Sequence, residues 1–176
     1  DQKRNIPLEY KNNAGLSLCY YGDAGWGNLV RSGKYYDNHF SDELVKASVH
    51  LICDIWQPDP FPSWVTAIPS TRHPNLVPDF ARRLAGHLRV PFYSVIRRIR
   101  EAPEQKTMQN GFMQARNVIN TIQIDQRVSQ EPVLLVDDII DSGWTLTMAG
   151  YLLKKQGNGQ VYPFTLAQAT SRNANG

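Results

Sequence analysis

Residues 133–145 decide the fold, and they read Val133-Leu134-Leu135-Val136-Asp137-Asp138-Ile139-Ile140-Asp141-Ser142-Gly143-Trp144-Thr145. Four consecutive apolar residues are typical of a strand that is buried on both faces of a parallel sheet. Two carboxylates follow where we expect that strand to end, and a Ser-Gly-x-Thr turn then opens a helix. Ligands of open α/β sheets bind beyond the carboxyl ends of the strands. The stretch therefore predicts a binding site together with a fold.

Strands and helices alternate on both sides of this stretch. We expect strands at 64–68, 91–96, 133–136 and 161–167. We expect helices from the capping Ser41 to about Ile55, from about Pro78 onward, and from the Ser-Gly turn to Gly157. The alternation predicts an α/β fold with a mainly parallel sheet and helices on both faces. Because Pro163 has no N–H to donate, we expect its strand to lie at a sheet edge or to be bulged.

The length and composition suit one domain with short additions. The chain has 176 residues, 41% of them hydrophobic, and its first residue is Asp1, which suggests a piece of a longer protein. We divide it into a linker or arm at 1–14, a segment rich in glycine and aromatic residues at 15–40, and the main domain at 41–176. No apolar run is long enough to span a membrane. Cys19 and Cys53 are expected to be reduced, buried thiols of a cytoplasmic protein.

The net charge of +3 conceals an uneven distribution. Residues 72–116 hold nine basic side chains and three acidic ones, so this window carries 9 − 3 = +6. The rest of the chain then carries 3 − 6 = −3. Such a basic segment favours an anionic partner, and phosphate is the commonest one.

The residues after the buried strand suit a phosphorylated sugar. The start of the following helix offers unpaired N–H groups and the hydroxyls of Ser142 and Thr145, while Gly143 lets the backbone approach an anion closely. Asp137 and Asp138 could accept hydrogen bonds from a vicinal diol or hold a divalent cation through water. A ribose phosphate makes both demands at once.

The whole stretch resembles the ribose-phosphate signature of the type I phosphoribosyltransferases. The resemblance extends over about 41–170, with 68–72 as the pyrophosphate loop and 97–117 as the mobile loop of that fold. It implies a type I phosphoribosyltransferase-like α/β fold with a small, loop-rich N-terminal hood. A narrower similarity covers 18–34 with Gly25-Trp26-Gly27, 69–91, 108–117 and 141–145. It is to the C-terminal extension of some bacterial RecQ-type ATP-dependent DNA helicases, and also to the ComF competence proteins.

The resemblance implies a role for each matching residue. Asp137 and Asp138 would hold the ribose hydroxyls, and the 5-phosphate would be wrapped by Asp141, Ser142, Gly143, Trp144 and Thr145. The pyrophosphate, with Mg²⁺ carried by the ligand and not held directly by the protein, would meet Ser70, Thr71 and Arg72. Asp137 and Asp138 could help to hold the Mg²⁺. Asp141 would be the catalytic residue, acting as a base on an incoming purine.

Two functions remain open at this level. One is an enzyme that binds phosphoribosyl pyrophosphate with Mg²⁺ and transfers phosphoribosyl to a base. The other is a non-catalytic domain of a helicase that binds a nucleotide or DNA, next to the helicase core in the parent chain. Arg97, Arg98 and Arg100 could equally form an exposed charge run or touch DNA or pyrophosphate. Trp144 is expected either in the core or in a lid.

Overall fold

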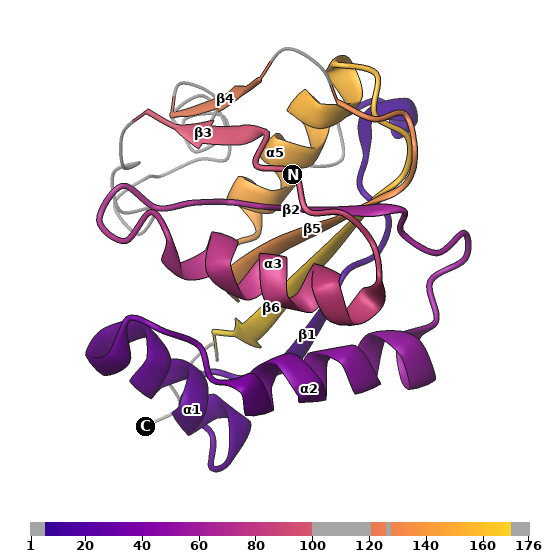
Figure 1. Cartoon of the computed structure of the whole chain (residues 1–176). Coiled ribbons are helices and arrows are strands. Elements are labelled where there is room, and N and C mark those ends of the chain that lie inside the picture. Colours follow the sequence, from indigo (N-terminus) through magenta and orange to yellow (C-terminus); the bar gives the residue numbers. More distant parts are fainter. Residues whose placement is uncertain (1–5, 100–120, 126–127, 170–176) are drawn as a thin grey trace, which may run out of the picture.

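A parallel four-stranded sheet forms the centre of the molecule in the computed structural model, which describes residues 6–99, 121–125 and 128–169 (Figure 1). The strand order is β1 (Leu16–Tyr20), β6 (Val161–Gln168), β5 (Val133–Ile140) and β2 (Trp64–Ala67). All three neighbouring pairs are parallel. The predicted α/β fold with a mainly parallel sheet is confirmed.

Helices cover both faces of this sheet (Figure 1). On one face, α2 (Asp42–His50) and α3 (Leu76–Leu88) pack on the side chains of Val65, Leu134 and Phe164. On the other face, α5 (Trp144–Lys155) packs on the side chains of Val133, Leu135 and Val161, among others. Each strand alternates its side chains between the two faces, so the apolar run of β5 supplies both cores.

The other helical segments among the described residues lie in the N-terminal half of the chain. They are the 3₁₀-helix η2 (Leu8–Tyr10), α1 (Trp26–Ser32) with the π-helix η3 (Gly33–Asp37) directly after it, and the π-helix η4 (Leu51–Trp56), which continues α2. Residues 15–40 are therefore more regular than the loop-rich hood expected from their glycines. Their strand β1 is part of the main sheet.

Two helix starts differ in detail from the sequence prediction. The helix predicted from Ser41 is present, but the Ser41 side chain makes no capping hydrogen bond. Its backbone carbonyl instead accepts from the N–H groups of Leu44 and Val45. The helix predicted near Pro78 begins at Leu76. The expected end of the last helix is confirmed, because Gly157 follows Lys155 closely and has a positive φ of 96°.

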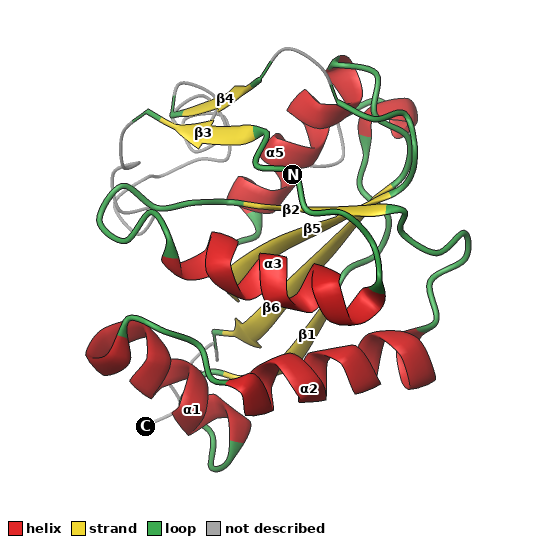
Figure 2. Cartoon of the chain, viewed as in Figure 1, coloured by secondary structure: helices red, strands yellow, loops and turns green. Residues whose placement is uncertain are grey.

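The strand predicted at 91–96 is wrong. Only one isolated bridge, Val65 to Phe92, connects this stretch to the main sheet. The chain then forms β3 (Ile96–Arg98), which pairs antiparallel with β4 (Ile122–Ile124) in a separate two-stranded sheet (Figure 2). The apolar pattern correctly predicted that Val95 and Ile96 are buried. They pack, however, in the hydrophobic cluster that includes α5 and are not part of a strand of the main sheet.

The strand containing Pro163 lies inside the sheet, so the prediction of an edge or bulged strand is wrong. β6 pairs with β5 along its length and with β1 from Phe164 onward. Pro163 falls one residue before the first pair with β1, where its missing donor removes no bond of that ladder. Gly15 lies opposite, and a Cβ on Gly15 would come within 2.6 Å of the Pro163 carbonyl oxygen.

The two cysteines are free, as predicted, although both are only half-buried. Cys19 on β1 donates a hydrogen bond from Sγ to the carbonyl of Leu166 at 3.2 Å. Burial raises the pKa of the Cys19 thiol to about 11, and the nearby charge of Asp23 adds to the shift. Within the described residues, no helix combines the length and the apolar character that crossing a membrane requires.

Candidate functional site

The site begins where β5 continues past its neighbour. The last residue pair between β2 and β5 is Ala67 with Val136, and the N–H of Ile68 still donates to the carbonyl of Val136 at 2.9 Å. The chain of β2 then turns away at Pro69, while β5 continues to Ile140 on its β6 side. The predicted strand end at Val136 is therefore wrong for β5, but it does mark the point beyond which β2 no longer covers the strand. Asp137 and Asp138 lie at this open end.

Each of the two carboxylates bonds to the backbone N–H of the next residue. Asp137 accepts through Oδ1 from the N–H of Asp138 at 2.8 Å, and Asp138 accepts through Oδ1 from the N–H of Ile139 at 2.7 Å. Such short bonds hold the side chains in one orientation. Both residues line one cavity of about 160 Å³.

The electrostatics of Asp137 reflect its burial. Burial raises the pKa of Asp137 well above the ordinary range of an aspartate, and the adjacent charge of Asp138 raises it further. The hydrogen bond from the backbone of Asp138 and the charges of Arg98 and Lys34 act in the opposite direction but do not cancel the shift. A carboxyl whose pKa is shifted by burial and by a neighbouring charge is a common feature of binding sites.

A lysine from the N-terminal segment reaches the second carboxylate. Lys34 lies on η3, and its Nζ is 2.8 Å from Oδ2 of Asp138. Only 28% of the Lys34 side chain and 12% of the Asp138 side chain are exposed. Burial alone would lower the pKa of Lys34, but Asp138 and Asp137 raise it above its ordinary value. The ammonium is therefore held charged at the edge of the same cavity.

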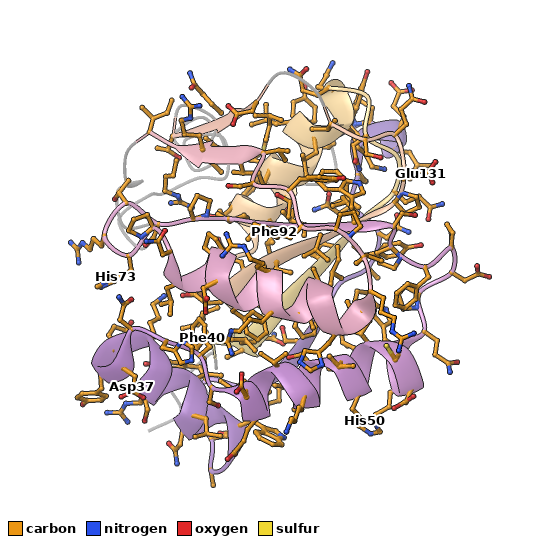
Figure 3. All side chains as sticks on the ribbon, viewed as in Figure 1. Asp37, Phe40, His50, His73, Phe92 and Glu131 are labelled. Carbon is orange, nitrogen blue, oxygen red and sulfur yellow. The ribbon has the colours of Figure 1, made fainter. Side chains whose placement is uncertain are left out.

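The loop after β2 also lines the cavity, with Ser70 and His73. Arg98, the last residue of β3, lines it as well. The Ser70 hydroxyl accepts from the N–H of His73 at 3.0 Å, a bond that shapes this loop. Figure 3 shows His73 on the loop that leads into α3. Of the residues predicted for the pyrophosphate loop, the structure thus places Ser70 beside the carboxylates.

The other two residues of that loop lie further out. Thr71 and Arg72 are exposed. Thr71 lines a neighbouring cavity of about 440 Å³ together with Arg82, Arg97 and Arg98, and Ser70 borders both cavities. Arg72, which was predicted to meet the pyrophosphate, borders neither of them, whereas Arg98 lines both.

The predicted phosphate loop turns at a glycine, as expected. Gly143 has a φ of 79° and precedes the first residue of α5, Trp144. Ser142 Oγ accepts from the N–H of Trp144 at 3.4 Å. The indole of Trp144 is only 6% exposed and packs in the core under α5, so only its backbone could meet a ligand. Asp141 is exposed in the turn before it, and Thr145 is half-buried.

Two halves of the predicted site thus open into different cavities. Asp137 and Asp138 face the cavity with Ser70, whereas Ser142 and Gly143 line a larger one of about 730 Å³ beside β1. The lining of that larger cavity mixes apolar and polar groups, and the polar ones include the hydroxyls of Ser17 and Thr165, which are 2.6 Å apart. A ligand held by the carboxylates and the loop together would have to pass over the end of β5.

The carboxylates do not fit a directly bound Mg²⁺. Across 6–99, 121–125 and 128–169, no three His, Cys, Asp or Glu side chains gather as ligands of one ion. Both oxygens of Asp138 already have partners, namely the N–H of Ile139 and the ammonium of Lys34. A metal carried by a ligand's own phosphates would not need such a cluster.

The sequence pattern of the phosphoribosyl transferase domain matches residues 79–173, which is more than half of the chain. The chain belongs to the phosphoribosyl transferase domain family. The matched range includes β5, the loop after it and α5, but it does not include the loop at 69–75 or Lys34. Thus the carboxylates and the phosphate loop lie within the family's own region, and two further walls of the cavity come from outside it.

Three solved structures that resemble this one differ from it widely in sequence. The Helicobacter pylori xanthine-guanine-hypoxanthine phosphoribosyltransferase is 22% identical, with 77% of this chain and 80% of that chain covered and a TM-score of 0.47. The Trypanosoma brucei adenine phosphoribosyl transferase, in complex with AMP, pyrophosphate and ribose-5-phosphate, is 14% identical, with coverage of 86% and 73% and a TM-score of 0.46. A hypothetical protein from Neisseria gonorrhoeae with bound ppGpp is 16% identical, with coverage of 92% and 77% and a TM-score of 0.47. No curated protein matches the chain.

Sequence reasoning missed Lys34 and Arg98 as neighbours of the carboxylates. The sequence identified Arg98 only as a member of the basic segment and not as a neighbour of Asp137 and Asp138. Lys34 gave no signal, because its contact joins residues from opposite ends of the chain. Of the predicted mobile loop at 97–117, the part from residue 100 onward lies outside the described residues, as do Arg100, Lys106 and Arg116 of the basic run.

Proposed function

We propose that this chain binds phosphoribosyl pyrophosphate or a related ribose 5-phosphate at the open end of β5. The observation that carries the proposal is the position of Asp137 and Asp138 on the part of β5 that extends beyond β2, in one cavity with Ser70. The oxygens of carboxyl groups can accept hydrogen bonds from a ribose diol. Membership of the phosphoribosyl transferase domain family supports this assignment.

In this proposal the ends of the ligand have separate partners. The 5-phosphate would lie at the N-terminus of α5, against the backbone from Ser142 to Thr145, where unpaired N–H groups attract anions. The pyrophosphate would lie toward Ser70, Thr71 and Arg72. Mg²⁺ bound to the ligand's phosphates would neutralise part of the charge on the leaving group.

The proposal extends to transfer of the phosphoribosyl group to a base. A base would displace pyrophosphate from the anomeric carbon, with Asp141 as the residue acting on the incoming purine. Positioning both reactants can contribute about 7–11 kcal/mol to such a reaction. The carboxylates of Asp137 and Asp138 would favour the positive charge that develops on the ribose ring.

Calorimetric titration with phosphoribosyl pyrophosphate and Mg²⁺ tests the binding step. The wild-type protein should release or absorb heat with a saturable stoichiometry of one. The double variant Asp137→Asn with Asp138→Asn should lose that signal. Asp54→Asn is the matched control, because Asp54 is 63% exposed on η4 and pairs only with His50 among its described neighbours. No heat from the wild type, or equal heat from the double variant, would refute the proposal.

We also propose a second function, a non-catalytic nucleotide- or DNA-binding accessory domain of a RecQ-like helicase. It would act with the helicase core in DNA recombination or repair in the cytoplasm. It is favoured by the cavity of about 440 Å³ that Arg82, Arg97 and Arg98 line. The Arg97 side chain is 66% exposed and pairs with Asp125 at 3.2 Å, so it could exchange that partner for a phosphate.

Salt dependence separates this alternative from sugar-phosphate binding. Affinity for single-stranded DNA should fall steeply between low and high salt, because phosphate contacts release counterions. Arg97→Ala and Arg98→Ala should weaken it, while Asp137→Asn should not. DNA affinity that stays constant across the salt range would count against the accessory-domain function.

A further inference from the structure

The position of Lys34 is fixed by its surroundings. The preceding residue, Gly33, is buried, and a Cβ there would come within 2.7 Å of the carbonyl oxygen of His39 and 2.8 Å of the ring of Phe40. The backbone that carries Lys34 therefore packs closely against the chain leading into α2. Its ammonium is delivered to Asp138 from a well-packed helix, unlike a lysine on an exposed loop.

The ammonium of Lys34 already pairs with the Asp138 carboxylate, which a metal ion would otherwise use as a ligand. Nζ of Lys34 is 2.8 Å from Oδ2 of Asp138, and the N–H of Ile139 is 2.7 Å from Oδ1. A hard divalent cation would need these same oxygens. Two positive groups, Lys34 and Arg98, and two carboxyl groups, Asp137 and Asp138, line the cavity together. Lys34 and Arg98 therefore supply the positive charge of the described walls.

We propose that Lys34 is a built-in cation of this site: its ammonium takes the place beside Asp138 that a divalent ion would otherwise occupy. The binding of an anionic sugar phosphate then depends on Lys34 more than on Mg²⁺. Lys34 acts as a positioning residue, because it neutralises Asp138 and holds its Oδ2 toward the cavity. The part that concerns ligand affinity rests on the proposed function, whereas the part that concerns metal exclusion does not.

Metal binding to the ligand-free protein tests the exclusion directly. Mn²⁺ titration followed by electron paramagnetic resonance should show no bound ion at this site in the wild type. Lys34→Met should create one bound Mn²⁺, and the double variant Lys34→Met with Asp138→Asn should abolish it. Lys34→Arg, which keeps the charge, should behave as the wild type. Lys46→Met is the matched control, since Lys46 is exposed on α2.

Two results of this titration would overturn the proposal. One is equal Mn²⁺ binding by the wild type and Lys34→Met. The other is no Mn²⁺ binding by Lys34→Met although its thermal unfolding shows that it is folded. Should Lys34→Met fail to fold, Lys34→Gln replaces it in the same comparison, with the same two results counting against the proposal.

Affinity for ribose 5-phosphate, measured with EDTA and then with Mg²⁺, tests the consequence for binding. In EDTA, Lys34→Met should bind about tenfold or more weakly than the wild type and Lys46→Met, because one positive charge near the anion is lost. Mg²⁺ should restore most of the affinity of the variant and change that of the wild type little. Affinities in EDTA within twofold of each other would overturn this part. If the wild type binds no sugar phosphate under either condition, the proposed function fails, and the Mn²⁺ titration still decides the role of Lys34.

Discussion

Arg83 links α3 to the start of α2, and its replacement by methionine should destabilise the fold. From α3 its guanidinium donates to the carbonyl of Phe40, to Asp42 at the start of α2 at 2.8 Å, and to Asp79 one turn earlier at 3.2 Å. The Arg83 side chain is only 23% exposed. Figure 3 shows Phe40 between α3 and the N-terminal helices.

The expected loss can be divided among these three bonds. Phe40 is fully buried, and a buried carbonyl left without a partner costs about 1–3 kcal/mol. The two ion pairs are worth about 0–1 kcal/mol each, because the Asp42 and Asp79 side chains are 80% and 42% exposed. We therefore expect Arg83→Met to cost about 2 kcal/mol. In a domain of this length that corresponds to a fall of about 4–8 °C in Tm.

Denaturant and thermal unfolding at low and high salt measure this loss and its origin. Asp42→Asn should cost less than about 1 kcal/mol and should lose its effect in 1 M NaCl, because it removes only an exposed ion pair. Most of the Arg83→Met loss should persist in high salt, since a hydrogen bond to a buried carbonyl is poorly screened. The reasoning fails if Arg83→Met costs less than about 0.5 kcal/mol, or if its whole effect disappears in 1 M NaCl.

Two further outcomes are expected. Since the pKa of Cys19 is about 11, its thiol is almost entirely protonated at pH 8, and iodoacetamide should modify it far more slowly in the folded protein than in guanidinium chloride; equal rates would contradict the raised pKa. Gly150→Ala should destabilise the fold, because the new Cβ would clash with the side chain of Asn12. Gly86→Ala on α3 has open space around the new Cβ and should stabilise the fold by about 0.5–1 kcal/mol. Chemical denaturation compares the two variants, and a loss in both would show that the space around Gly86 is not open.

The stretch at 133–145 predicted both the central strand and the turn into α5. It wrongly predicted that the strand ends at Val136, and this error has a physical cause. The apolar residues up to Val136 mark the part of β5 that lies between β2 and β6, so a pattern of burial could locate it. The strand continues through Asp137 to Ile140 because its pairing with β6 continues there. Composition cannot reveal pairing on one side only, since polar and apolar residues are both accepted where a strand is half-covered.

Other features depended on contacts between distant segments. Val95 and Ile96 have the apolar character of a strand, but whether they join the main sheet depends on β4, which pairs with β3. Pro163 predicted an edge strand. It is tolerated inside the sheet because β1 pairs with β6 only from Phe164 onward. Lys34 is the clearest case, because neither its neighbours nor its spacing points to Asp138.

β1 and β6, which pair in the sheet, are the first and the last of the strands that the structure describes, and this has a consequence for synthesis. During translation β6 emerges long after β1, since the paired residues Ser17 and Thr165 are 148 positions apart. The sheet therefore closes late, through a contact of long sequence separation. Without β1 in place, β6 would be an edge strand with seven buried residues, from Val161 to Ala167, and would offer an unpaired ladder to other chains. Loss of residues up to Tyr20 should therefore cause aggregation during expression before it affects any ligand.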